Sequence, residues 1–438
     1  MNDLLRQIRN ERRANLWLGV ELLVVFTVMW YLVDWTYVTV RTYLQPMGFD
    51  TEHCYELTFN RLTPQAEGYQ PGDDAEADMR NLLEIVERLR HRPGVEYVAV
   101  SQNSIPYIDG SNGFNLRIDS VLTTGMLRWG QPDYFRMFRV QGVAVLTEDG
   151  RKVSTTSPDS LAEAVHRSDR NVIISRNYVS AERYAKLGYA DALPLLGYEC
   201  DYTQSDGTYT FKIAGICEPM RWSHFETTEQ WGGPIVGYEL RDPDIINLGN
   251  PLYVQVSLRL KPEADTGADF VEALLDDADR LYTLGNVFLL DVQPFTALQR
   301  TMEMDDVNEA RTQLCVIGFL LLNIFLGVIG TFWFRTQHRR SEIALRMAFG
   351  STRRGVFRRL TDEGLLLLTL AAVPAALIAF NVGMAELVDV ERMPFSAARF
   401  LWALAMTWVL MALMVVLGIW YPARRAMRIQ PAEALHDE

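Results

Sequence analysis

Three long stretches without a charged residue most restrict what this 438-residue chain can fold into. They span residues 314–334, 364–384 and 400–420. At about 1.5 Å per residue, each would form a helix of roughly 30 Å, the thickness of the hydrocarbon core of a bilayer. We therefore predict three transmembrane helices, at residues 312–334, 363–384 and 400–420.

A fourth apolar segment, residues 16–40, contains Glu21 and Asp34. A charged acid costs about 2.5–3.5 kcal/mol at the centre of an inserting helix and less near its ends. Both acids lie towards the ends, so the segment is predicted to be the first transmembrane helix. A cleavable signal peptide is the alternative, because a basic start precedes the apolar stretch. The length and tryptophan content of the stretch favour a membrane anchor, as does the lack of a small-x-small site before Arg41.

The charges divide the chain between the two sides of a membrane. Arginines are concentrated in residues 1–15, in the loop at 335–362 and in the tail at 421–438, which the positive-inside rule places in the cytoplasm. Residues 41–311 hold 25 Lys or Arg against 42 Asp or Glu, a net charge of 25 minus 42, or -17. The predicted fold is therefore a multi-pass protein of the inner (cytoplasmic) membrane, with four transmembrane α-helices and a large α+β extracytoplasmic domain between helices 1 and 2. A short outer loop would occupy residues 385–399. The acidic external domain argues against nucleic-acid binding.

Two parts of the external domain show the same order of elements. Each has a strand with alternating apolar residues, an amphipathic helix and a second strand, in the first part at 54–62, 76–91 and 95–101 and in the second at 252–260, 267–283 and 286–293. Two such units would pair into one α+β layer sandwich built from residues 41–104 and 246–293. Residues 105–245 would then form an inserted subdomain, and residues 294–311 a stalk helix that runs directly into the second span.

The insertion carries its own signals. We predict strands at 171–175 and 209–216, a loop leading into a helix at 130–135, and a helix at 180–187. Cys54, Cys200 and Cys217 lie in the external domain and Cys315 lies in a span. The spacing allows either a Cys200–Cys217 disulfide or buried free thiols.

Motifs of common catalytic sites are missing from the sequence. None of the four lysines stands in a Gly-Lys-Ser/Thr sequence, which a Walker A phosphate loop requires. The sequence also lacks His-x-x-x-His and Cys-x-x-Cys spacings, which many metal sites use, and the Gly-x-Ser-x-Gly elbow of serine hydrolases. We therefore expect a non-enzymatic chain with no catalytic, cofactor-binding or metal site of its own.

The loop between the second and third spans is basic and carries apolar residues at helical spacing. Ile343 and Met347 are four residues apart, as are Leu345 and Phe349, so each pair would meet on a helix surface. Gly350 would end this helix, and Ser351 or Thr352 would cap the helix that follows. Docking against a partner protein and lying on an anionic membrane surface fit the residues equally well.

The same loop resembles the signature of MacB/FtsX-type ABC transporter permeases. The matching positions are Arg339, Arg340, Glu342, Ile343, Leu345, Arg346, Ala348, Gly350, Arg353, Arg354, Glu363 and Gly364. The tail is similar to the closing motif of that family at Pro422, Ala423, Arg424, Arg425, Ala426, Pro431, Glu433, Ala434 and Leu435. Residues 132–135, 171–175 and 211–216 resemble its periplasmic core. The aromatic and acidic first span departs from the family pattern.

The resemblance implies a permease subunit without a fused ATPase, engaging a separate ATP-binding subunit that would hold ATP and Mg. The expected ATPase-coupling interface is Glu342, Ile343, Leu345, Arg346, Met347, Phe349 and Gly350, and the expected cytoplasmic tail motif is Pro422, Arg424, Arg425, Pro431, Glu433 and Leu435. A homodimer or a heterodimer with a related permease would form, with a periplasmic adaptor and an outer-membrane channel as further partners.

By the same resemblance, the function would be mechanotransmission, in which ATP hydrolysis drives motion of the periplasmic domain for efflux or extraction of amphiphilic substrates. An FtsX-like regulator of a cell-wall hydrolase and a lipoprotein-release permease are the alternatives.

Overall fold

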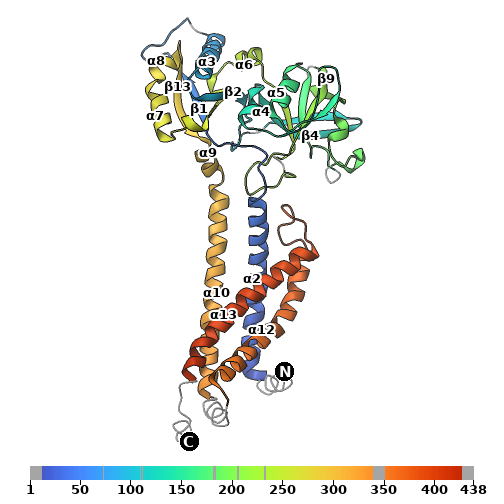
Figure 1. The fold of residues 1–438 in the computed structure, drawn as a ribbon, viewed down its shortest axis with the longest axis vertical. Helices are drawn as coiled ribbons and strands as arrows, with labels where there is room; N and C mark the ends of the chain where they lie inside the picture. The colour runs from blue at the N-terminus through green and yellow to red at the C-terminus, as the bar shows by residue number, and fades with distance from the viewer. Residues whose placement is uncertain are drawn as a thin grey trace. The chain divides into compact units, whose positions relative to one another are not determined.

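The computed structural model describes residues 12–72, 74–108, 110, 112–180, 184–204, 207–230, 233–338 and 351–426 (Figure 1). The chain divides into two compact units. Residues 43–305 form the external unit, and the segments on either side of it form the membrane unit.

The membrane unit contains four long helices. They are α2 (Arg12–Tyr43), α10 (Met304–His338), α12 (Arg353–Met384) and α13 (Ala397–Ala426). Each is long and apolar enough to cross a membrane, which confirms the four predicted spans. Phe26 and Trp30 of α2, Leu368 of α12 and Ile419 of α13 belong to one buried cluster. Apolar side chains on the outer faces remain exposed, as lipid contact requires.

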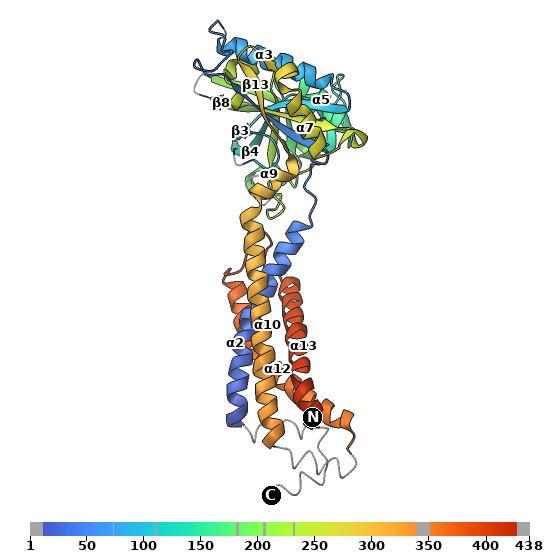
Figure 2. The same cartoon turned by 90° about the vertical axis from the view of Figure 1, so that its left-hand side faces the viewer.

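The external unit contains the strand-helix-strand order twice, although the strand predicted at 252–260 begins only at Gln255 and the helix predicted at 267–283 is divided after Asp276. Strands β1 (Cys54–Arg61), β2 (Val95–Gln102), β11 (Gln255–Leu260) and β13 (Val287–Pro294) run antiparallel in the order β2-β11-β1-β13. Helices α3 (Ala75–Arg90) and α7 (Ala268–Asp276) lie beside these strands (Figures 1 and 2). Apolar alternation explains the arrangement, because Leu57 and Phe59 of β1 and Leu82 of α3 are buried in one cluster.

The segment predicted as an inserted subdomain, residues 105–245, shares its β-sheet with the strands on either side of it in the sequence. Its β4 pairs with β2 at Ser101 and Gly130, so the insertion extends the same sheet. The strand order is β10-β7-β9-β8-β3-β4-β2-β11-β1-β13-β12, and β10 also pairs with β4. Off this path, β5 pairs with β9, and β6 pairs with β5. The inserted elements are β3 (Gly113–Ile118), β4 (Val121–Gly130), α4 (Asp133–Met137), β5 (Gly142–Leu146), β6 (Lys152–Ser154), α5 (Pro158–His166), β7 (Asn171–Ser175), η1 (Ala185–Leu187), η2 (Leu193–Leu195), β8 (Glu199–Gln204), β9 (Gly207–Cys217) and β10 (Ile235–Glu239). The last elements of the unit are α6 (Asp242–Leu248), η3 (Pro251–Tyr253), η4 (Pro262–Ala264), α8 (Ala278–Leu281), β12 (Thr283–Leu284) and α9 (Phe295–Met302).

Two helix predictions need correction. The helix predicted at 180–187 is only the 3₁₀ turn η1 within the described residues, and residues 181–183 lie outside them. The single stalk helix predicted at 294–311 is instead two helices, α9 and α10, which are separated at Glu303. Glu303 has φ −90° and ψ 6°, outside helical geometry, and its side chain is held by a neighbouring loop described below.

The cysteines are free thiols, so the Cys200–Cys217 disulfide is wrong and the alternative is confirmed. Cys200 lies opposite Phe211 in the β8–β9 pair, whereas Cys217 ends β9 and lies opposite Ser175 of β7. The sheet register therefore separates the two sulfur atoms. Burial raises the pKa of each thiol to about 12, which makes both poor nucleophiles.

Candidate functional site

The predicted coupling residues lie outside the described residues. These are Glu342, Ile343, Leu345, Arg346, Met347, Phe349 and Gly350, together with Pro431, Glu433 and Leu435 of the tail motif. The other tail residues, Pro422, Arg424 and Arg425, lie in the last turns of α13. The helix start after the loop is confirmed, because the Thr352 hydroxyl accepts a hydrogen bond of 3.1 Å from the Gly355 N–H.

A buried ion pair explains the acid in the outer half of the first span. Asp34 of α2 and Arg399 of α13 are each 1% exposed, and the guanidinium donates from Nε and Nη2 to the two carboxylate oxygens at 2.8 and 2.5 Å. Arg399 also donates to the carbonyls of Asp389 and Met393 in the outer loop. A bidentate pair satisfies both charges, so Asp34 connects α2 to α13 within the membrane unit.

Two asparagines of the spans bond within their own helices. Asn323 donates to the Phe319 carbonyl at 2.8 Å, and Asn381 donates to the Leu377 carbonyl at 2.7 Å. These amides satisfy their donors locally, which leaves close helix packing to apolar and small residues.

The acid nearer the N-terminal end of α2, Glu21, faces such a small residue. A methyl group placed on Gly327 of α10 would lie 2.8 Å from Glu21 Oε1. The glycine therefore provides the space that the carboxylate occupies between the two helices.

The base of the external unit is organised by one loop, residues 220–226. Arg221 is fully buried, and its Nη1 donates to the Gln45 carbonyl at 2.6 Å while its backbone N–H donates to the Met47 carbonyl at 2.9 Å. The loop therefore holds the segment that follows α2. We call Arg221, His224, Gln299, Glu303 and these two carbonyls the base cluster.

The same loop also holds the segment that precedes α10. Glu303 Oε1 accepts from the His224 backbone N–H at 2.8 Å and contacts His224 Nδ1 at 2.7 Å. Gln299 of α9 donates to Glu303 Oε2 at 3.0 Å, and the Tyr43 ring packs 5.0 Å from the His224 ring. The base cluster thus ties the first and last segments of the external unit to one another.

Charge-assisted hydrogen bonds make the Glu303 carboxylate the centre of the base cluster. Burial alone would raise its pKa, but the hydrogen bonds from His224 and Gln299 outweigh burial and lower the pKa below its ordinary value of 4.5. Because the folded-state pKa is depressed, the stabilisation is present above pH 4.5 and is lost as the pH falls through the folded-state value.

We predict that Glu303→Gln lowers the stability of the external unit by about 1.5–3 kcal/mol at pH 7, because hydrogen bonds to a charged group are replaced by weaker ones. Acid should reduce this difference, since the wild-type carboxylate then becomes neutral. Thermal unfolding of the detergent-solubilised chain at pH 7 and pH 4 measures both effects. Glu229→Gln, at a described position outside the base cluster, is the control. An equal difference at both pH values would contradict the role of ionised Glu303.

Three motifs singled out in the sequence meet in one core of the external unit. Tyr134 and Phe135 of α4, Ile173 of β7 and Ala214 of β9 belong to the same buried cluster. The strands β7 and β9 are parallel neighbours, and a side chain on Gly237 of β10 would meet the Phe135 ring at 2.7 Å. These motifs therefore serve as packing elements of the domain.

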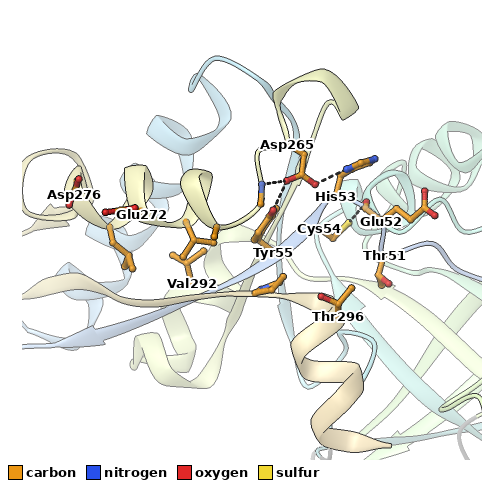
Figure 3. Close-up of a pocket in the computed structure, with 15 residues that line it drawn as sticks. Thr51, Glu52, His53, Cys54, Tyr55, Asp265, Glu272, Asp276, Val292 and Thr296 are labelled. Atoms are coloured by element: carbon orange, nitrogen blue, oxygen red, sulfur yellow. Dashed lines mark hydrogen bonds and ion pairs between the residues drawn. The ribbon is translucent and has the colours of Figure 1, made fainter.

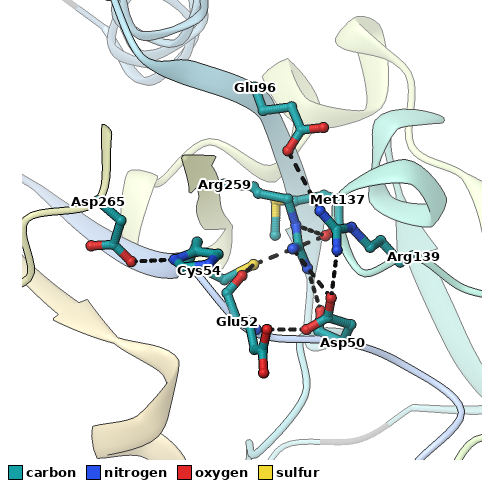
Figure 4. A network of polar contacts seen from close by, with 9 residues as sticks. Asp50, Glu52, Cys54, Glu96, Met137, Arg139, Arg259 and Asp265 are labelled. Atoms are coloured by element: carbon teal, nitrogen blue, oxygen red, sulfur yellow. Dashed lines mark hydrogen bonds and ion pairs between the residues drawn. The ribbon is translucent and has the colours of Figure 1, made fainter. Parts of the chain in front are cut away.

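A buried arginine joins the two halves of the sheet (Figure 4). Arg259 of β11 is fully buried, donates from Nε to the Met137 carbonyl of α4 and donates from Nη2 to the Asp50 carbonyl at 2.6 Å. Its Nη1 lies 3.4 Å from Asp50 Oδ2, which also pairs with Arg139 at 3.1 Å. Sequence alternation placed residue 259 on β11 but gave no sign that a charged side chain would be buried there.

Residues 314–431 match the model of the FtsX-like permease C-terminal family. The chain is 24% identical over 271 residues to the pyoverdine export ATP-binding/permease protein PvdT of Pseudomonas savastanoi pv. phaseolicola. That alignment covers 59% of this chain and 38% of the relative, so the chain spans well under half of that protein's length.

Two solved structures are similar to the external unit. The periplasmic region of MacB from Actinobacillus actinomycetemcomitans aligns with a TM-score of 0.31 at 12% identity, covering 60% of this chain and 97% of that one. A domain described as a permease from Porphyromonas gingivalis aligns with a TM-score of 0.35 at 15% identity, covering 57% of this chain and 92% of that one.

The family match covers the second, third and fourth spans and the intervening loop, where the sequence resemblance is strongest. Residues 314–431 therefore form an FtsX-like permease C-terminal domain, in a chain that is similar over 59% of its length to an export ATP-binding/permease protein.

Proposed function

We propose that this permease works by mechanotransmission. ATP hydrolysis in a separate ATP-binding subunit would move the cytoplasmic loop and the membrane helices, and that motion would change the external unit so that amphiphilic substrates are expelled or extracted. The N- and C-termini and the coupling loop would lie in the cytoplasm, as the distribution of arginines indicates.

The base cluster is the observation that carries this proposal. Two connections join the external unit to the membrane unit, at residues 42–43 and 305–306. Arg221 holds the segment after the first connection, and Glu303 holds the segment before the second, both through loop 220–226. A displacement of either helix would therefore load the same buried polar cluster. A loosely attached domain would need no such shared anchor.

The charge pattern of the spans supports the same mechanism. Among the described residues, the acid in the outer half of the first span is paired with Arg399 and is almost completely buried. An ionisable group that served a substrate path would be expected to face an aqueous cavity. Pairing of Asp34 with Arg399 favours a mechanical role for these two helices over passage of a polar substrate beside them.

The partners follow from the same proposal. The permease would act as a homodimer or as a heterodimer with a related permease, each copy engaging an ATP-binding subunit that carries ATP and Mg. A periplasmic adaptor and an outer-membrane channel would complete an efflux assembly.

Recruitment of the ATPase is tested with Leu345→Asp/Phe349→Asp. We expect the double variant to lose at least tenfold of the co-purifying ATP-binding subunit, because two charges replace apolar side chains of the predicted ATPase-coupling interface. The measurement is affinity purification from native membranes in mild detergent, with quantitative mass spectrometry and an ATPase assay.

Val153→Asp in the external unit is the matched control, since Val153 is an exposed apolar residue. It should leave the complex intact. Unchanged recovery of the ATP-binding subunit with the loop variant would refute the assigned coupling role.

A further inference from the structure

A groove lies on the external unit between α7 and the ends of β1 and β13 (Figure 3). Its volume is about 780 Å³, and it is lined by Thr51, Glu52, His53, Cys54, Tyr55, Asp265, Gly267, Ala268, Val271, Glu272, Leu275, Asp276, Val292, Pro294 and Thr296. In Figure 3 the labelled side chains form a row, from Asp276 and Glu272 at one end, past Val292 and Tyr55, to His53 and Glu52 at the other. The groove therefore suits an elongated ligand, and its volume falls within the range of about 300–1,000 Å³ typical of small-molecule sites.

The middle of the groove is apolar. Val271 and Leu275 are one helical turn apart on α7 and line the same side, facing Val292 and Pro294 of β13. Leu275 is 39% exposed although it sits beside a buried cluster. An exposed leucine in a concave wall gains free energy when an apolar group covers it.

The charges around this apolar wall have one sign. Glu52, Glu272 and Asp276 have no ion-pair partner among the described residues, and no lysine or arginine lines the groove. His53, the basic lining residue, is paired with Asp265 at 2.7 Å. The groove thus combines an apolar body with uncompensated carboxylates at both ends, which disfavours anionic ligands and favours cations.

The acids on α7 are unfavourably placed for the helix itself. Glu272 and Asp276 are four residues apart, where like charges on a helix surface repel one another. Asp276 is also the last residue of α7, where the helix dipole disfavours a negative charge. A bound cation would relieve both effects.

The opposite end of the groove is rigid and preorganised. Asp265 accepts hydrogen bonds from the Tyr55 hydroxyl at 2.5 Å and the Gly267 N–H at 3.0 Å, in addition to its contact with His53. Burial would raise the pKa of Asp265, but these hydrogen bonds outweigh it and lower the pKa, so the carboxylate is ionised at neutral pH. The Tyr55 ring is held against Phe270 at a centroid distance of 5.0 Å.

We infer that this groove binds an amphiphilic ammonium compound, with its cation at Glu272 and Asp276 and its apolar body along Val271, Leu275 and Val292. The inference names a substrate class for the permease and so rests on the proposed function, although binding itself needs no ATP-binding subunit. Binding is favoured by three effects together. The carboxylates contact the cation, the apolar walls contact the body of the ligand, and the cation relieves the repulsion between the two acids on α7.

Binding is tested with rhodamine 6G, a fluorescent lipophilic cation, on the full chain in a neutral maltoside detergent. We expect saturable binding by fluorescence anisotropy, weakened at least tenfold in Glu272→Gln/Asp276→Asn and weakened further by salt because these carboxylates are exposed. The anionic dye 8-anilinonaphthalene-1-sulfonate should not compete. Leu275→Asn should also weaken binding, which tests the apolar wall separately from the charge.

The matched control is Glu263→Gln/Asp269→Asn, which removes the same two charges from exposed positions near the groove that do not line it. It should bind as the wild type does. Equal loss in both double variants, no loss in either, or no saturable binding would overturn the inference. Intact cation binding without ATPase recruitment would instead overturn only the proposed function, and ATPase coupling without cation binding would overturn only this inference.

Discussion

Asp34→Ala should be among the most destabilising substitutions in the membrane unit. Its removal leaves the Arg399 guanidinium, itself 1% exposed, without a countercharge among apolar helices. Breaking a buried ion pair on one side costs about 3–5 kcal/mol. We expect a sharp fall in the amount of folded protein and in the melting temperature of the solubilised chain, measured by fluorescence-detected size exclusion and differential scanning fluorimetry.

The double variant Asp34→Leu/Arg399→Leu separates loss of charge balance from loss of packing. It should be more stable than Asp34→Ala, because it leaves no unpaired buried charge. Glu21→Gln is the matched control, since it changes the other acid of the same helix. If the double variant loses more stability than Asp34→Leu and Arg399→Leu lose together, the ion pair is not the source of the effect.

Arg259→Met should produce the largest loss of stability in the external unit. The substitution keeps the apolar stem of the side chain but removes the donors to the Met137 and Asp50 carbonyls. Each of the two buried acceptors left without a donor costs about 1–3 kcal/mol, so we expect a loss of roughly 2–6 kcal/mol. Because Met137 belongs to α4 and Asp50 precedes β1, the two halves of the sheet should also loosen relative to one another.

Hydrogen exchange of the full chain in detergent measures that loosening directly. Amides of β2, β11 and α4 should exchange faster in Arg259→Met than in the wild type. The control is Arg139→Leu. Arg139 pairs with the same Asp50 but is 48% exposed, and surface ion pairs contribute about 0–1 kcal/mol. Equal exchange in Arg259→Met and in the wild type would show that the buried arginine does not join the two halves.

The four membrane helices and the repeated strand-helix-strand units were predictable because each depends on local periodicity. A run without charges predicts a span regardless of its neighbours, and alternation in β1 and β11 predicts a buried face. The Thr352 cap was predictable for the same reason, since a hydroxyl before a helix satisfies a local backbone donor.

The continuous sheet was not predictable, because strand pairing joins residues far apart in the chain. The pairing of Ser101 in β2 with Gly130 in β4 joins the insertion to the first strand-helix-strand unit. Neither segment carries a sequence pattern that predicts this pairing. The break at Glu303 was missed for a related reason. Its cause is His224, 79 positions away in the sequence.

The candidate sites divide in the same way. The sequence by itself determined the four spans, the acidic external domain and the coupling motif, because hydropathy, charge and a short motif are properties of contiguous residues. Only the tertiary structure decided that Asp34 is paired with Arg399, that Arg221 and Glu303 hold the two ends of one domain, and that the acids of α7 line an apolar groove. A buried charge is stable only beside its partner, and partners brought together by folding are not neighbours along the chain.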